Sequence, residues 1–330
     1  MTKRPNTTKN RSLSLAAAVV GVLASTAAAQ LTPHREYYGI GRTIPMQVAM
    51  PEGVAGDVEI ALYAPSGDEV AVAAAAEGAV DLAGLFPVLW TTGDPKPLYA
   101  QLLVDDKGIG APVVLIPMTT PNLARSDGRA VSFPAQSARA KTYAGVRAWV
   151  DRQVVLTTSL GDIRFRMRPD KAPNTVTSFV DLVEGGYYTD IIFHRIIGAR
   201  GGRAPFMAQV GDPTGTGSGG PGRFVDLEPS DLPHDFGVLS MARTGNPDTN
   251  GGQVFVCFSR EGTSFLDTQY CSFAQAVEGA DVIMALETVE TDDMDFPADP
   301  PVLKSAKTIP APPFGTGDAP LERPAAVTER

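Results

Sequence analysis

Short segments with the side-chain alternation of β-strands recur along this chain of 330 residues, and turns rich in glycine and proline separate them. Only two segments show a sustained helical pattern. One runs from Pro173 to Gly185 and keeps apolar residues on one face, and the other covers about Ala280–Leu286. A chain with this pattern is predicted to fold mainly as β-sheet.

Changes in pattern along the chain predict two folded domains, which its length allows. Residues 30–121 combine short candidate strands with turn signals and are predicted to form a smaller β-sandwich-like domain. Its role stays open between binding of a partner or carbohydrate and a spacer. Residues 122–150 lack a sustained apolar period and are predicted to be a linker. Residues 151–309 form the second domain, and residues 310–330, rich in Pro, Ala and Gly, are predicted to be a disordered tail.

The first 29 residues have the three parts of a secretory signal peptide. Four basic residues precede an apolar run from Leu13 to Leu23, which is too short to span a bilayer comfortably. A cleavage site of the A-x-A type follows at Ala27–Ala29. We therefore expect export to the periplasm, the cell envelope or the cell exterior, as in bacteria. The alternative is an uncleaved membrane anchor.

Charge and cysteine content exclude some function classes. The formal net charge of −9 argues against nucleic acid as a partner. The two cysteines, Cys257 and Cys271, form either a disulfide in an oxidising compartment or two buried thiols, and their spacing does not decide between these. The aspartates between residues 292 and 299 miss the spacing of an EF-hand loop and are predicted to be solvated. No metal ion is predicted.

One stretch of the second domain brings polar and apolar groups close together in the sequence. Arg195 lies in the predicted strand Ile191–Ile197, and Gln209 follows within the segment Phe206–Asp212. The stretch contains no nucleophile, metal-ligand cluster or phosphate loop. Rotation about an X-Pro bond needs little more than a hydrogen-bond donor in a dry pocket. The twisted prolyl nitrogen regains its lone pair, so a guanidinium that donates to it stabilises the twisted state more than the planar one.

The motifs around this stretch resemble, in their order, those of the cyclophilin-type peptidyl-prolyl cis-trans isomerases. The resemblance runs from about Asp151 to about Ile309. It rests on these segments: Thr157–Ile163, Ala172–Val176, Gly186–Tyr188, Phe193–Ile197, Phe206–Asp212, Gly237–Ala242, Thr249–Val256, Phe265–Asp267 and Val277–Ile283. The family's fold, a closed eight-stranded antiparallel β-barrel with two capping helices, is therefore expected here.

The resemblance implies a role for each candidate site residue. Arg195 would be the catalytic guanidinium, and Gln209 would hydrogen-bond the substrate backbone and help to hold Arg195. The residues expected to line the proline pocket or to pair with the substrate through the main chain are Phe206, Met207, Ala242, Arg243, Phe255, Phe265, Leu266 and Tyr270. His194 is expected to be packed without an acid–base role, and His234 to be solvated or capping. The resemblance implies no cofactor, a monomer, and proline-containing polypeptides as partners.

Three departures from the family's pattern bear on function. Phe265 stands where tryptophan is common in the family. The resemblance implies that this change weakens cyclosporin binding more than it weakens catalysis. Tyr270 stands where many members have a histidine at the pocket rim. The eight residues Gly198–Pro205 stand where the family usually has two. This insertion either loops out or covers the site, and in the second case Arg200 and Arg203 would favour acidic sequences near the proline.

The sequence thus predicts an exported peptidyl-prolyl isomerase that accelerates proline-limited folding of other exported proteins. Two alternatives stay open. The first is a module that binds proline-containing peptides without turning them over. The second is an adhesion or scaffold protein of the cell envelope, in which the first domain carries the main function.

Overall fold

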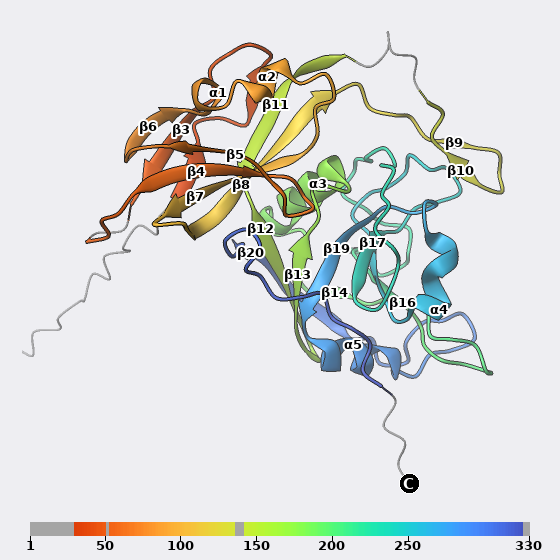
Figure 1. Cartoon of the computed structure of the whole chain (residues 1–330). Helices are drawn as coiled ribbons and strands as arrows, with labels where there is room; N and C mark the ends of the chain where they lie inside the picture. Colours follow the sequence, from red (N-terminus) through yellow and green to blue (C-terminus); the bar gives the residue numbers. More distant parts are fainter. Residues whose placement is uncertain (1–29, 51–52, 136–141, 326–330) are drawn as a thin grey trace, which may run out of the picture.

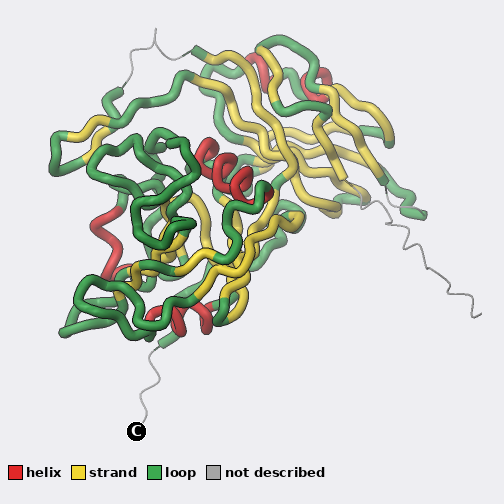
Figure 2. The backbone as a smooth tube through the Cα atoms, turned by 180° about the vertical axis from the view of Figure 1, so that it is seen from behind, coloured by secondary structure: helices red, strands yellow, loops and turns green. Residues whose placement is uncertain are grey.

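The computed structural model describes residues 30–50, 53–135 and 142–325, which form two β-rich units (Figure 1). The predicted signal peptide lies outside the described residues. The mainly β character predicted from the sequence is confirmed. Seen from behind, strands run through both units, and long loops gather around the second (Figure 2). No helix among the described residues has the length and apolar character needed to cross a membrane.

The first unit contains two antiparallel sheets. The three-stranded sheet has the order β1 (Gln30–Pro33), β3 (Pro45–Ala49) and β6 (Gly78–Asp81). The six-stranded sheet has the order β2 (Tyr37–Gly39), β11 (Tyr143–Val150), β8 (Lys107–Thr119), β7 (Leu98–Val104), β4 (Val58–Tyr63) and β5 (Glu69–Ala74). Short helices α1 (Leu82–Leu85) and α2 (Val88–Thr91) follow β6. Alternate residues of both sheets, such as Met46, Val48, Leu62 and Val113, meet in one buried core.

Residues 122–150 are not a linker throughout, which corrects the prediction. Tyr143–Val150 forms strand β11, paired with β2 on one side and β8 on the other. Val146 and Ala148 of this strand are buried in the first unit's core. Strands β9 (Arg125–Ser126) and β10 (Val131–Ser132) form a small hairpin. Composition rich in Arg, Ala and Gly does not indicate a strand. Strand β11 was therefore missed, because its pairing partners β2 and β8 lie in other parts of the sequence.

The second unit is built around one antiparallel sheet of nine strands. Their order is β14 (Ile191–Ile192), β20 (Val302–Pro310), β12 (Arg152–Thr158), β13 (Gly161–Met167), β19 (Ser272–Glu278), β17 (Val238–Met241), β18 (Val254–Cys257), β16 (Met207–Val210) and β15 (Arg195–Ile197). The helices are α3 (Pro173–Glu184), α4 (Arg260–Thr263) and α5 (Ala280–Glu287), with a 3-10 turn η1 (Ser264–Leu266).

The predicted closed eight-stranded barrel is not confirmed, because the nine-stranded sheet is an open half-barrel. Its two edge strands, β14 and β15, are not hydrogen-bonded to each other. They are nevertheless joined covalently through only Phe193 and His194. The last strand of the order therefore begins shortly after the first one ends along the chain.

Helix α3 has the predicted bounds for the predicted reasons. Pro173 opens it, where a missing backbone N–H costs nothing, and Gly185 caps its end. Its buried face includes Phe179, whose ring lies 5.2 Å from that of Tyr188 and 5.0 Å from that of Phe273. Figure 1 shows α3 between the six-stranded sheet and the rest of the second unit.

Only one residue separates the two sheets along the chain. Strand β11 ends at Val150 and β12 begins at Arg152. The residue between them, Asp151, donates its N–H to Pro112 O (2.8 Å), and its own carbonyl accepts from Ala311 N (3.3 Å). Burial raises the pKa of its carboxyl group to about 7. The main chain is therefore held on both sides at the junction.

The C-terminal segment, which was predicted to be a disordered tail, contacts the folded units as far as Arg323. The ring of Phe314 lies 5.1 Å from Tyr63 and 4.9 Å from Tyr99 of the first unit. Arg323 forms a two-pronged ion pair with Glu287 of helix α5, at 2.7 and 2.8 Å. Composition predicted disorder here, but the side chain of Phe314 packs on the first unit and that of Arg323 pairs with the second. Residues 326–330 lie outside the described part.

We expect Phe314→Ala to lower the free energy of unfolding by about 1–3 kcal/mol, because each aromatic pair contributes about 0.5–1.5 kcal/mol. Urea unfolding followed by tyrosine fluorescence would measure this loss. Phe224→Ala is the matched control, since Phe224 is 68% exposed. Equal stability of Phe314→Ala and the unaltered chain would contradict docking of this segment.

The two cysteines are free thiols, which settles the question left open by the sequence. Both Cys257 and Cys271 are buried, and no disulfide joins them. The Sγ of Cys271 lies 3.3 Å from the hydroxyl of Thr175. Burial raises the pKa of the Cys271 thiol to about 12, so it stays protonated and unreactive near neutral pH.

Candidate active site

A row of side chains crosses four neighbouring strands of the second unit. Arg195 on β15 pairs directly with Gln209 on β16, Gln209 pairs with Phe255 on β18, and Phe255 pairs with Ser240 on β17. Residues directly opposite in antiparallel strands point to the same face of the sheet, with their Cβ atoms about 5 Å apart. The strand register therefore brings together residues that are up to 60 positions apart in the sequence.

The two faces of these strands have different roles. The alternate residues Ile196, Ala208 and Val256 point into the main core of the second unit. On the other face, Met207, Phe255 and Leu266 belong to a separate apolar cluster. Because both faces are covered by apolar side chains, the strands that carry the candidate site form a rigid support.

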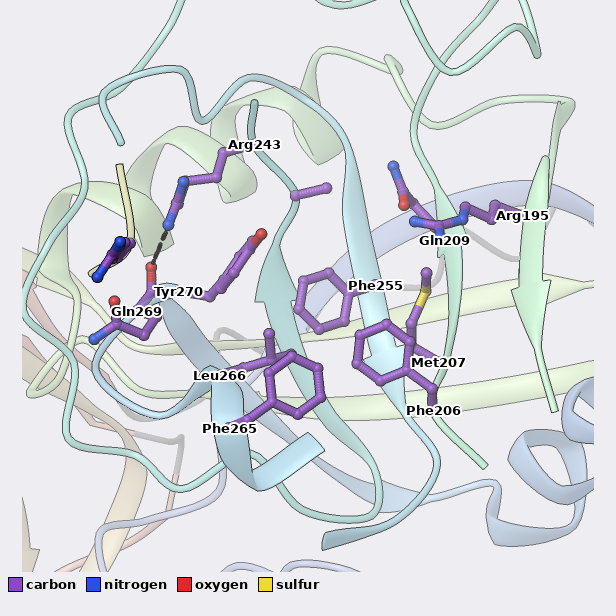
Figure 3. Close-up of a pocket in the computed structure, with 12 residues that line it drawn as sticks. Arg195, Phe206, Met207, Gln209, Arg243, Phe255, Phe265, Leu266, Gln269 and Tyr270 are labelled. Carbon is purple, nitrogen blue, oxygen red and sulfur yellow. Dashed lines mark hydrogen bonds between the residues drawn. The ribbon is translucent and has the colours of Figure 1, made fainter. Parts of the chain in front are cut away.

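All of the candidate residues line one cavity of about 510 Å³, shown in Figure 3. They are Arg195, Gln209, Phe206, Met207, Ala242, Arg243, Phe255, Phe265, Leu266 and Tyr270. Two further lining residues, Arg129 and Gln269, were not predicted as site residues. Arg129 belongs to the predicted linker and Gln269 to a loop, and neither lies in a segment that carries the family resemblance.

Aromatic rings make up much of the cavity wall. The ring of Phe206 stacks on that of Phe265, with 5.6 Å between centroids, and Phe255 meets Tyr270 edge to face at 6.1 Å. Phe255 and Leu266 are only 4% exposed and form the floor, whereas Phe265 is 68% exposed and forms the rim. The cavity is therefore apolar at its base and open above, as a proline ring requires.

Arg195 stands at the edge of this apolar floor, with its side chain 46% exposed. Its Nη2 lies 3.3 Å from Oδ2 of Asp295. Asp295 is itself held, because its carbonyl oxygen accepts the N–H of Ile196 at 2.9 Å. Arginine has five N–H donors, so one ion pair leaves others free for a ligand. The ion pair thus positions the guanidinium and leaves N–H groups available to a ligand.

The expectation that Gln209 helps to hold Arg195 stays a prediction, and no hydrogen bond joins the two side chains among the described residues. Gln209 lies beside Arg195 (Figure 3), but its Nε2 donates to Oε1 of Gln253 at 2.8 Å. Gln253 in turn donates to the carbonyl oxygens of Gly217 and Gly219. The residue that pairs with Arg195 is Asp295, which the sequence placed in a solvated acidic loop. No local pattern links two residues 100 positions apart.

The insertion Gly198–Pro205 does not line the cavity. Arg200 donates to the carbonyl oxygens of Thr291 (3.0 Å) and Asp292 (3.2 Å). These contacts turn the insertion away from the cavity and toward the loop that also carries Asp295. The idea that Arg200 and Arg203 select acidic substrates therefore has no support from their positions.

A histidine lies behind the cavity floor. His234 is completely buried, which corrects the expectation of a solvated side chain. Its ring stacks near Phe255 at 6.2 Å; Nδ1 is 3.1 Å from Asp267 Oδ1, and Nε2 is 3.0 Å from Ser240 Oγ. Although these three residues resemble a catalytic triad, Ser240 is also fully buried, so no substrate can reach its hydroxyl. The set is structural support for Phe255.

Burial lowers the pKa of His234 below the usual 6.5, against the opposing effect of Asp267. A histidine whose pKa is lower in the folded state stabilises the fold fully above about pH 6.5, and this contribution is lost as the pH falls through the folded-state pKa. Burial also lowers the pKa of His194, so this residue changes the stability with pH in the same direction.

As the pH falls from 7.5 to 5, protonation of His234 should lower the free energy of unfolding, whereas Asp151, whose carboxyl pKa is raised by burial, acts in the opposite direction. We therefore expect His234→Gln to lose less free energy of unfolding over this range than the unaltered chain, or to gain more. Urea unfolding at the two pH values would measure both changes. An equal change in the two proteins would show that His234 does not contribute, and His194→Gln would then test the contribution of His194.

Comparisons with known proteins point to one family. The family model for the cyclophilin type peptidyl-prolyl cis-trans isomerase/CLD matches residues 153–308. The chain is 41% identical to peptidyl-prolyl cis-trans isomerase-like 3 of Dictyostelium discoideum over 157 residues, which cover 46% of this chain and 92% of that protein. It is 38% identical to peptidyl-prolyl cis-trans isomerase-like 1 of Emericella nidulans, over 48% of this chain and 95% of that protein.

A longer relative and a solved structure each match a little under half of the chain. The match to the peptidyl-prolyl cis-trans isomerase CYP71 of Arabidopsis thaliana is 42% identical but spans only 22% of that protein and 44% of this one. A Cryptosporidium parvum cyclophilin type peptidyl-prolyl cis-trans isomerase, crystallised in the presence of the dipeptide Ala-Pro, is 34% identical. It covers 47% of this chain and 96% of that one, with a TM-score of 0.43.

Proposed function

Because this chain belongs to the cyclophilin-type peptidyl-prolyl cis-trans isomerase family, we propose that the cavity beside Arg195 binds proline-containing polypeptides and accelerates rotation about their X-Pro bonds. The enzyme class, peptidyl-prolyl cis-trans isomerase, follows from the relatives. The mechanism, the clients and the place of action are our proposals.

The uncatalysed rotation is slow because amide resonance sets a barrier of about 18–20 kcal/mol. In our mechanism the proline ring rests on Met207, Phe255 and Leu266, which exclude water from one side of the bond. As the bond twists, the prolyl nitrogen becomes pyramidal and accepts a hydrogen bond from Arg195. No covalent bond forms or breaks, and no proton is transferred. The rate gain comes from a hydrogen bond that exists only in the twisted state.

The observation that carries this proposal is the register of three adjacent strands. It aligns the guanidinium of Arg195, the amide of Gln209 and the ring of Phe255 on one face. A permanent positive charge thereby stands at the edge of an apolar floor. In such surroundings a preorganised donor stabilises a developing lone pair more strongly than water does.

The substrate main chain would be held at the end of strand β17. The N–H of Ala242 already donates to Gln253 O at 2.9 Å, so it is occupied. The carbonyl of Ala242 and the N–H of Arg243 make no hydrogen bond with described residues. These two groups are therefore the ones that would pair with the peptide, as a short antiparallel strand would.

NMR exchange spectroscopy on a short peptide that contains Ala-Pro-Phe would test the activity. We expect faster cis–trans exchange in the presence of the purified chain than in buffer or with albumin. Peptide binding without faster exchange would contradict the enzymatic proposal and identify a proline-binding module instead. We expect cyclosporin to inhibit only weakly, because Phe265 presents a smaller wall than tryptophan would.

Export is a separate part of the proposal and rests on the sequence of residues 1–29. We propose that the chain is exported and accelerates the folding of other exported proteins. Expression in a bacterium, followed by cell fractionation and N-terminal sequencing, would test this. We expect a periplasmic or secreted product that begins at Gln30. A cytoplasmic product with its original N-terminus would contradict export.

A further inference from the structure

The β9–β10 hairpin reaches the rim of the candidate active site. It belongs to the connection between strands β8 and β11, which are both part of the first unit, but it lies against the second unit (Figure 1). Gln269, which lines the cavity, binds the hairpin through both polar atoms of its side-chain amide. Its Oε1 accepts the N–H of Val131 at 2.6 Å, and its Nε2 donates to the carbonyl of the same residue at 3.4 Å. Val131 is 9% exposed and packs into the core of the second unit.

The hairpin tip is ordered by its own side chains. Oδ1 of Asp127 accepts the N–H groups of Arg129 and Ala130, both at 2.8 Å. This is the Asx arrangement that fixes a tight turn. The two contacts of Val131 and the turn of Asp127 together hold Arg129 where it lines the cavity.

The cavity is positively charged although the chain as a whole is acidic, with a net charge of −9. Three arginines line it, and no aspartate or glutamate does. Arg195 is paired with Asp295. Arg243 stacks on Tyr270 at 4.3 Å and donates to the carbonyls of Thr244 (2.8 Å) and Gln269 (2.9 Å).

The third of these arginines, Arg129, differs from the other two. Within the described residues its guanidinium makes no hydrogen bond or ion pair, while its main chain is held by the turn. Asp127 on the same hairpin does not line the cavity. The guanidinium of Arg129 is therefore unpaired among the described residues, its main chain is fixed, and it lines the same cavity as the apolar floor. Such a group is suited to pair with a negatively charged side chain of the bound peptide.

We propose that the β9–β10 hairpin is a specificity element, in which Arg129 recognises an acidic residue next to the proline of the bound peptide. This inference rests on the proposed function, because it concerns the same cavity. It assigns a role in substrate choice to a hairpin that extends from the first unit onto the second. The preference comes from attraction between exposed charges, so it is modest and depends on salt.

The test uses pairs of peptides that differ only by Glu or Gln, placed in turn at each of the two positions before and after Ala-Pro. The ratio of kcat/KM for the Glu peptide to that for the Gln peptide is measured by NMR exchange, which avoids a coupled protease with its own preference. At one position we expect a ratio of about two to five at low ionic strength, the range of an exposed ion pair. The ratio should approach one in about 1 M salt, where the screening length is about 3 Å.

Two variants assign the preference to the hairpin. Arg129→Ala should bring the ratio close to one, whereas Arg125→Ala should leave both kcat/KM values unchanged, because Arg125 is an exposed arginine of the same hairpin that does not line the cavity. Gln269→Ala should also reduce the ratio, since it releases the hairpin without removing the charge of Arg129.

The inference is overturned if the unaltered chain shows equal ratios at every position, or if Arg129→Ala keeps the preference. Failure of the proposed function would look different, because exchange would then be slow for Gln and Glu peptides alike. In that case the preference is measured as the ratio of the Kd values of the Gln and Glu peptides, obtained by NMR titration. A Glu preference in Kd that depends on Arg129 would still support the hairpin's role.

Discussion

Replacement of Arg195 by alanine is expected to lower kcat/KM for an Ala-Pro peptide by about 10²–10³. This is the usual loss when one preorganised donor to a transition state is removed. The reason is that Arg195 is the cation aligned with the apolar floor by the strand register. Arg195→Lys should recover only part of the rate, because an ammonium group cannot donate to the prolyl nitrogen and pair with Asp295 in the same planar geometry.

NMR exchange at several peptide concentrations would measure this effect. Arg200→Ala is the matched control, since Arg200 binds the 291–292 loop and does not line the cavity. The loss in Arg195→Ala should appear mainly in kcat, with peptide binding largely kept. If Arg195→Ala keeps more than about a tenth of the activity, its guanidinium is not the donor that the mechanism requires, because a tenfold change corresponds to only about 1.4 kcal/mol.

The second large effect concerns the contact between the two units. We expect Arg147→Ala to lower the free energy of unfolding by about 2–4 kcal/mol, because hydrogen bonds to charged groups contribute about 1.5–3 kcal/mol each and are not additive. Arg147 is 8% exposed and belongs to strand β11. Its partners on helix α3 are Asn174 Oδ1 (3.0 Å), Pro173 O (3.0 Å) and Thr177 Oγ1 (2.6 Å).

Two further contacts hold the same guanidinium. It stacks over the ring of Trp149 at 4.6 Å, and its Nε lies 3.4 Å from Oε1 of Glu36. Removal of Arg147 therefore leaves acceptors of helix α3 without their donor and weakens the contact between the two units. We expect the unaltered chain to unfold in one transition and this variant to unfold in two.

Calorimetry together with urea unfolding would show both the lost stability and the number of transitions. Arg42→Ala serves as the control, because Arg42 is exposed in the first unit. Arg147→Lys should be intermediate, since it keeps the charge but not the fork of donors. A stability of Arg147→Ala within about 0.5 kcal/mol of the unaltered chain would show that the units do not depend on this contact.

Much of the candidate site was predictable from short segments of sequence. Helix α3 begins and ends where Pro173 and Gly185 indicated. Every residue singled out through the family resemblance lines the same cavity. This succeeds because the alternation of a strand determines which side chains share a face, and because the motifs occur in the order of the family. The roles of these residues in catalysis stay predictions.

The errors have a common origin in contacts between distant segments. Asp295 was placed in a solvated loop, and it pairs with Arg195. Strand β11 was assigned to a linker, although it lies inside the six-stranded sheet. His234 was expected to be solvated or capping, and it is buried behind Phe255. In each case a contacting residue lies far along the chain, so the local sequence does not reveal the contact.

The sequence by itself determined the mainly β class, the strand faces and helix α3, because these depend on patterns within a few residues. Only the tertiary structure decided that the nine-stranded sheet stays open, that the C-terminal segment docks on both units, and that Arg129 reaches the cavity. These features depend on which surfaces meet after folding. The C-terminal segment is held by aromatic packing and the Arg323–Glu287 ion pair, and the hairpin by hydrogen bonds to Gln269, between segments that no local pattern connects.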